Sequence, residues 1–104
     1  MNELILVLTT MPGDDPADSM ARALVDERLA ACVNVYPPMI STYRWEGRID
    51  VERERQVVIK TTRARLDALE ARIRALHPYE LPEFIVIDAS ASAAYESWVN
   101  GAVP

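Results

Sequence analysis

Residues 31–62 read ACVNVYPPMISTYRWEGRIDVERERQVVIKTT, two extended segments joined by a tight turn at Glu46-Gly47. A strand rises about 3.3 Å per residue, so each segment, at about a dozen residues, would reach about 40 Å. A compact domain of this length has a diameter of only about 33 Å. We therefore predict that the hairpin projects beyond its own domain, and that a partner chain covers its backbone and apolar side chains.

The composition is that of one globular domain spanning residues 1–104. Half of the residues are hydrophobic, and the only cysteine, Cys32, excludes a disulfide within the chain. The first residues lack the basic start and cleavage site of a secretory signal, and their apolar run is too short to span a bilayer. We expect a cytoplasmic protein without membrane association. The net charge of -5 argues against nucleic-acid binding, because it repels a phosphate backbone.

Hydrophobic periodicity outside the hairpin predicts two strands and three helices. We expect the first strand to be central and buried on both faces. Asp14-Asp15 and Thr62 are expected to cap the first two helices, and Pro78 and Gly101 to stop the last two. The expected elements are a strand from Leu4 to Leu8, a helix from Pro16 to about Ala30, a helix after Thr62 as far as Leu76, a strand from Phe84 to Ile87 and a helix from Ala93 to Asn100.

The two strands of the hairpin carry different signals. Pro37-Pro38 interrupts the first strand, and because proline donates no ladder hydrogen bond, this strand must lie at an edge of the sheet. The second strand sorts its charges by face, and a solvated strand explains this better than pairing with oppositely charged neighbours. One face carries Ile49, Val51, Arg53 and Arg55, and the other carries Asp50, Glu52, Glu54 and Gln56.

The order of elements predicts an α+β, ferredoxin-like β-α-β-β-α-β fold. Its antiparallel sheet of four strands would have two helices on one face, an extended hairpin and a short C-terminal helix. Such a fold serves many functions. The hairpin lacks the basic-aromatic signature of an RNA reader, Cys32 stands alone, the glycines form no phosphate cradle, and no nucleophile can be matched with His77. We therefore expect no enzymatic activity.

One chemical cluster remains at residues 77–83, His-Pro-Tyr-Glu-Leu-Pro-Glu. His77 with the carboxylates of Glu80 and Glu83 could ligate a divalent cation. The simpler interpretation is that His77 lies at the end of the second helix, where a cation is favoured, while the glutamates face water. The sequence favours this interpretation and leaves the metal site as the alternative.

Trp45, beside Tyr43 at the tip of the hairpin, is a large aromatic residue on a projecting arm. It is expected either to insert into a neighbouring subunit or to line a ligand pocket at the boundary between subunits. We favour the interface, which would include Tyr36, Pro37, Tyr43 and Trp45.

Four segments, in this order and spacing, make the chain resemble a known family. They are Cys32-Val33-Asn34, Ser41 to Gly47, Ile59 to Thr62 and His77 to Glu83, and the likeness runs from Leu4 to about Asn100. The chain is similar to the divalent-cation tolerance family, CutA. The resemblance implies a stable homotrimer whose long hairpins wrap neighbouring chains, and a role in tolerance of copper and other divalent cations.

The chain departs from the copper-binding members of that family at two positions. Those members carry a cysteine where Thr9 stands and a second histidine where Leu76 precedes His77. With one such ligand left, any binding of copper or zinc should be weak, and no cofactor is required. The alternative function is a trimeric small-ligand sensor or scaffold with pockets at subunit boundaries, similar in architecture to the PII signalling proteins.

Overall fold

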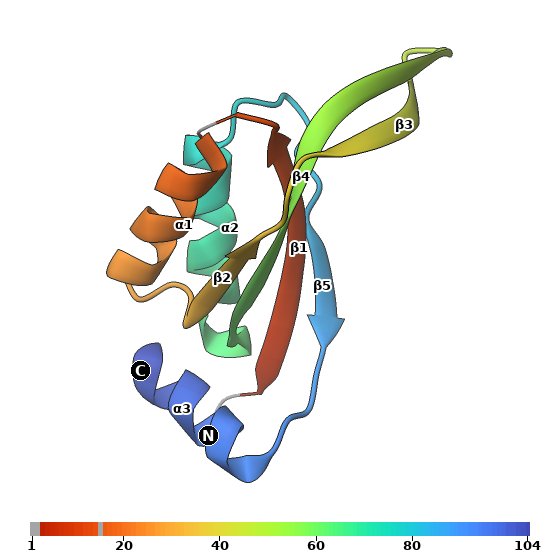
Figure 1. Ribbon diagram of the computed structural model, residues 1–104. Coiled ribbons are helices and arrows are strands. Elements are labelled where there is room, and N and C mark those ends of the chain that lie inside the picture. The colour runs from red at the N-terminus through yellow and green to blue at the C-terminus, as the bar shows by residue number, and fades with distance from the viewer. Residues whose placement is uncertain (1–2, 15) are drawn as a thin grey trace.

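The computed structural model describes residues 3–14 and 16–104. Its strands form one antiparallel sheet in the order β2-β4-β1-β5, and β3 also pairs with β4. Figure 1 shows α1 and α2 side by side on one face of the sheet, with α3 at its lower end. The elements are β1 (Leu4–Pro12), α1 (Pro16–Asp26), β2 (Cys32–Val35), β3 (Met39–Trp45), β4 (Arg48–Thr62), the 3-10 helix η1 (Arg63–Arg65), α2 (Leu66–Leu76), β5 (Ile85–Asp88) and α3 (Ala93–Ala102).

This is the predicted ferredoxin-like arrangement, with the first hairpin strand divided in two. β2 ends at Val35 and β3 begins at Met39, and the prolines at 37 and 38 lie between them. Both strands pair with β4 alone, so the edge position predicted from the prolines is confirmed. The sheet therefore has five strands where the sequence predicted four.

The β3–β4 hairpin projects beyond the rest of the chain, as predicted. β4 runs for 15 residues, and only its second half pairs with β1. The molecule measures 44 × 24 × 23 Å, and Figure 1 shows the hairpin extending away from the helices. Glu46 and Gly47 both have positive φ, 50° and 81°, which is the conformation of the two-residue turns that match strand twist.

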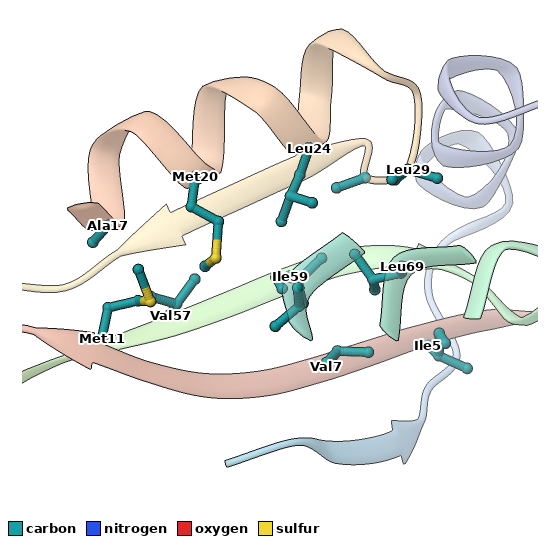
Figure 2. Packing of buried hydrophobic residues seen from close by; sticks show 12 residues of the cluster. Ile5, Val7, Met11, Ala17, Met20, Leu24, Leu29, Val57, Ile59 and Leu69 are labelled. Atoms are coloured by element: carbon teal, nitrogen blue, oxygen red, sulfur yellow. The ribbon is translucent and has the colours of Figure 1, made fainter. Parts of the chain in front are cut away.

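The core lies between the helices and the sheet (Figure 2). Every second residue of a strand faces the helices, and residues three or four apart on each helix face the sheet. The fully buried side chains include Ile5, Val7 and Met11 from β1, Val57 and Ile59 from β4, Met20 and Leu24 from α1, and Leu69 and Ile73 from α2.

The opposite face of the sheet is less covered than predicted. β1 was expected to be buried on both faces, but Leu6 and Leu8 are only partly buried. β5 is exposed throughout, including Ile85 and Ile87. α1 and α2 pack on the other face (Figure 1). α3 covers one end of this face, where its Val99 and Val103 pack with Leu4 and its Tyr95 ring lies near Lys60. Leu6 and Leu8 keep part of their apolar surface accessible.

Several element boundaries differ from the predictions, most of them because tertiary contacts override local signals. β1 continues to Pro12, since its last residues pair with β4 as far as Glu54. β5 is shifted by one residue and ends at Asp88. α1 ends at Asp26, short of Ala30, because Arg28 adopts a positive φ of 58° and turns the chain toward β2.

The residues predicted to cap or stop the helices include Thr62, Gly101 and Asp15. Thr62 is the last residue of β4, paired with Leu4, and it stands at the N-cap position of η1, but its buried hydroxyl makes no capping hydrogen bond. Gly101 does not stop α3 but lies inside it, and Ser92 provides the N-cap by accepting from the Tyr95 N–H. The predicted cap residue Asp15 lies outside the described residues.

Candidate functional site

His77 follows α2 as its C-cap, and its backbone N–H donates to the Ile73 carbonyl at 2.8 Å. The ring is buried, with 8% of the residue exposed. Nε2 lies 2.6 Å from the Thr10 carbonyl oxygen, and Nδ1 accepts from the Tyr79 N–H at 3.1 Å. Since a carbonyl only accepts and an amide N–H only donates, Nε2 donates to the Thr10 carbonyl and Nδ1 accepts from the Tyr79 N–H.

This geometry gives His77 a structural role at the end of β1. The ring joins the β1 backbone to the segment after α2, and Tyr79 packs against it with ring centroids 4.8 Å apart. The expected position at the helix end is confirmed. A cationic interaction with the helix dipole does not describe the contacts, because both ring nitrogens are engaged by neutral backbone groups.

Glu80 and Glu83 follow in the same segment but do not converge on His77. Glu83 Oε2 accepts from Gln56 Nε2 at 3.1 Å, and the same amide donates to the Thr9 carbonyl at 2.8 Å. Glu80 is exposed. Within residues 3–14 and 16–104, no three His, Cys, Asp or Glu side chains are placed to hold a metal ion. Metal binding by His77, Glu80 and Glu83 therefore stays a prediction without a preassembled site.

A cleft of about 900 Å³ lies where the hairpin meets the segment after α2. Because Met39 is opposite Glu54 and Tyr43 is opposite Asp50, alternate residues of β3 and β4 share the face that lines this cleft. This is the sheet face turned away from the helices. The cleft is lined by Thr10, Met39, Ser41, Tyr43, Trp45, Asp50, Glu52, Glu54, Gln56, Pro78, Tyr79, Glu80, Leu81, Pro82 and Glu83.

The charged side chains of the cleft are all acidic. They are Asp50, Glu52, Glu54, Glu80 and Glu83, and no Lys, Arg or His is among the lining residues. Glu54 is the most buried of the five, at 8% exposed. The solvated strand favoured from the sequence is therefore wrong for Glu54, because the segment after α2 covers its face of β4.

Two tyrosines donate hydrogen bonds to these carboxylates. Burial, then a hydrogen bond to Glu54 and the charges of Glu54 and Glu52, raise the pKa of Tyr79. Partial desolvation and a hydrogen bond to Glu52 raise the pKa of Tyr43. Both phenols stay protonated at neutral pH, so the cleft combines neutral aromatic rings with acidic oxygens.

The four residues predicted for the interface separate into two groups. Tyr43 and Trp45 line the cleft, as the ligand-pocket alternative for Trp45 requires. Tyr36 and Pro37 are exposed where the chain passes from β2 to β3, and Tyr36 has 50% of its surface accessible. Their contact with another subunit stays a prediction.

Sequence reasoning singled out Trp45 on the hairpin and Glu80 and Glu83 after α2, which line this cleft. It missed Glu54 as a site residue. The alternation of β4 placed Glu54 on the same face as Glu52 and Gln56, which the shared cleft confirms. No local signal showed that a segment more than twenty residues later would cover this face. The one available signal was the placement of acidic residues at the alternate positions 50, 52 and 54, on one face of the strand.

The fold and the cleft define a class of α+β proteins in which a ferredoxin-like sheet carries a long projecting hairpin. The family model of the CutA1 divalent ion tolerance protein matches residues 5–102. The divalent-cation tolerance protein CutA of Thermus thermophilus is 40% identical over 101 residues, which cover 96% of each protein. The chain belongs to the CutA1 divalent ion tolerance family.

Solved structures agree with this assignment. The crystal structure of CutA from Xylella fastidiosa has a TM-score of 0.93 and 41% identity, covering 98% of this chain and 99% of that one. CutA from Archaeoglobus fulgidus, described as a periplasmic divalent cation tolerance protein, has a TM-score of 0.93 and 26% identity, covering 97% and 99%. In the part of the chain that the structure describes, no helix is long and apolar enough to cross a membrane.

Proposed function

We propose that this protein is a non-enzymatic, cytoplasmic homotrimer that contributes to tolerance of divalent cations. Membership of the CutA1 family carries the proposal. The trimer is supported by the projecting hairpin, whose Ile40, Ile49 and Val51 are all more than 60% exposed. Contiguous exposed apolar surface of this kind is typical of an interface with another chain. The number of subunits rests on the family resemblance.

The oligomer is tested by native mass spectrometry and by sedimentation over a range of concentrations. The wild type should sediment as a trimer, and Ile49→Asp with Val51→Asp should dissociate it, because charges would be buried without partners. Val25→Asp is the matched control, since Val25 is an exposed apolar residue on α1, away from the hairpin. A wild type that sediments as a single polypeptide when dilute would overturn the proposal.

We further propose that any bound divalent cation, such as copper or zinc, is held weakly. Glu80 and Glu83 would supply oxygen ligands, and His77 could join them only by giving up a hydrogen bond. Calorimetric titration of the metal-free protein with copper and zinc tests this. Glu80→Gln with Glu83→Gln should reduce the heat more than the control Asp67→Asn, at an exposed carboxylate on α2. Absence of heat in the wild type would remove the metal part of the proposal.

The cleft supports a second candidate, a trimeric small-ligand sensor or scaffold similar in architecture to the PII signalling proteins. Its volume of about 900 Å³ lies within the range of small-molecule pockets, about 300–1,000 Å³. A ligand that binds only the folded protein raises its melting temperature. A thermal-shift panel of nucleotides, amino acids, organic acids and amines tests this candidate, and a panel without any shift would contradict it.

A further inference from the structure

We propose that Arg55 fixes the direction in which the β3–β4 hairpin projects, and so holds the exposed apolar face of the hairpin ready for a neighbouring subunit. This inference rests on the proposed oligomer and names the side chain that orients its arm. It follows from three features: a break in strand pairing at the base of the hairpin, the contacts that Arg55 makes across this break, and the position of the apolar surface beyond it.

Strand pairing is interrupted at the base of the hairpin. β2 ends with Val35 opposite Val57, and β3 begins with Met39 opposite Glu54. Residues 36–38 therefore stand opposite residues 55 and 56 of β4, and such an extra residue in one strand is typical of a β-bulge, which bends the strand. The prolines at 37 and 38 donate no ladder hydrogen bond here.

The other neighbour of β4 ends at the same level. β1 stops at Pro12, which is the partner of Glu54. Beyond this point β4 pairs with β3 alone, and the hairpin continues from the sheet as a ribbon of two strands (Figure 1). Hinges lie at such ends of elements. On the face turned away from the helices, a hydrogen bond between Tyr79 and Glu54 steadies this point.

Arg55 steadies the same point on the face turned toward the helices. It lies opposite Met11 and alternates with the buried Val57. Its Nε donates to the Tyr36 carbonyl at 2.9 Å, so a side chain of β4 bonds to the interrupted strand where the ladder is missing. This hydrogen bond is charge-assisted, and the planar guanidinium loses little freedom in forming it.

The same guanidinium also reaches α1. Its Nη1 lies 3.8 Å from Oδ1 of Asp18, in the first turn of that helix. The Asp18 side chain is 67% exposed, so this ion pair adds little energy and the bond to Tyr36 makes the larger contribution. Arg55 thus joins β4, the connection between β2 and β3, and the helix layer.

The direction of the hairpin matters because its apolar surface lies beyond the hinge. Ile40, Ile49 and Val51 are each more than 60% exposed. An arm that samples several directions binds a partner more weakly, in proportion to the fraction of time it spends in the competent one. Holding the arm in place beforehand removes this cost. Arg55 therefore favours assembly from the base of the hairpin, outside the apolar surface itself.

The direct test measures the direction of the hairpin in a single chain. Nitroxide labels at Glu46→Cys in the turn and at Ala71→Cys, an exposed position on α2, report the distance between the tip and the helix layer by double electron-electron resonance. Cys32→Ser removes the native thiol, and Ile49→Asp with Val51→Asp keeps the chains separate. This parent protein should give one narrow distribution of distances.

Two substitutions of equal charge then separate the brace from a general loss of charge. Arg55→Met keeps the length of the side chain and removes its donors, and it should broaden the distribution. Arg22→Met, at an exposed position on α1, should leave it narrow. Arg55→Lys, which keeps the charge without the planar fork, should lie between them. A distribution for Arg55→Met as narrow as that of the parent would overturn the inference.

Sedimentation of the chain with its native hairpin, over a range of protein concentrations, tests the link with assembly. Arg55→Met should raise the concentration at which half of the subunits are dissociated by about tenfold or more, and Arg22→Met by less than about twofold. Broader distances with unchanged dissociation would overturn this link. If the wild type is a single polypeptide, the proposed oligomer is wrong, whereas the label distances still decide whether Arg55 fixes the hairpin.

Discussion

The two halves of β4 have the same alternation of residues and opposite environments. Val57 and Ile59 are fully buried against the helices, whereas Ile49 and Val51, on the same side of the same strand, are 64% and 61% exposed. The difference arises because α1 and α2 cover only the half that pairs with β1. An apolar pattern therefore shows which face of a strand is suited to burial. The surrounding elements decide whether the chain itself buries that face.

The sharpest test of this comparison is to replace one isoleucine in each half of β4 with alanine. Ile59→Ala should lower the free energy of unfolding by about 2–5 kcal/mol, because it leaves a cavity in the core. Ile49→Ala should change the free energy of unfolding of the single chain by no more than about 0.5 kcal/mol. Any further loss should come from the contact between subunits and should therefore depend on protein concentration. Urea titrations at two protein concentrations separate the loss within the chain from the loss at the contact between subunits. Equal losses independent of concentration would show that the hairpin packs against its own chain.

His77 links the buried half of the sheet to the wall of the cleft. His77→Ala should cost about 1–3 kcal/mol, because the Thr10 carbonyl and the Tyr79 N–H lose their partner in a buried site. Chemical denaturation measures the loss, with Glu80→Gln as the control at an exposed neighbour. A loss no larger than that of the control would mean that water replaces the imidazole without penalty.

The stability of the hairpin tip, where β3 joins the exposed half of β4, can be tested by changing the turn glycine. Gly47 has a φ of 81° and no neighbour close to where a Cβ would lie, so Gly47→Ala should cost about 1–2 kcal/mol through backbone strain alone. Hydrogen exchange should show the effect confined to β3 and the first half of β4. Gly101→Ala is the control, because that glycine is helical and equally unobstructed. Loss of protection throughout the core would contradict a hairpin that opens independently.

The smallest expected effect concerns the hydrogen bond between Tyr79 and Glu54. Tyr79→Phe should lower the free energy of unfolding by about 0.5–1.5 kcal/mol at neutral pH. Because the pKa of Tyr79 is raised above its usual 10.0, the folded state keeps its proton when the unfolded chain loses it. Stability should therefore fall as pH rises above about 10, and less steeply in Tyr79→Phe. Urea titrations between neutral pH and pH 11 measure both slopes, and parallel slopes would exclude Tyr79 as the cause.

The order of elements could be predicted from local sequence, and their ends could not. Periodicity identified β4 and α2, and Pro37-Pro38 marked the break between β2 and β3, because these signals act within a few residues. Thr62 stands at the N-cap position of η1, yet its side chain makes no capping hydrogen bond, since pairing with Leu4 keeps it in β4. Long-range pairing outweighed a local preference at that position.

The candidate site was partly predictable for the same reason. Glu80, Glu83 and Trp45 were visible as chemistry-bearing residues, and all three line the cleft. The burial of Glu54 and the engagement of both nitrogens of His77 were not visible. Each depends on contacts between β1, β4 and the segment after α2, which are far apart in sequence.

The sequence by itself determined a projecting hairpin, an edge broken by two prolines and a strand with all its acidic side chains on one face, because strand rise, proline chemistry and alternation are local properties. Only the tertiary structure decided that this acidic face forms a cleft with Tyr79 and that His77 is held by backbone groups. Burial is set by what folds over a surface, and that covering segment comes from a distant part of the chain.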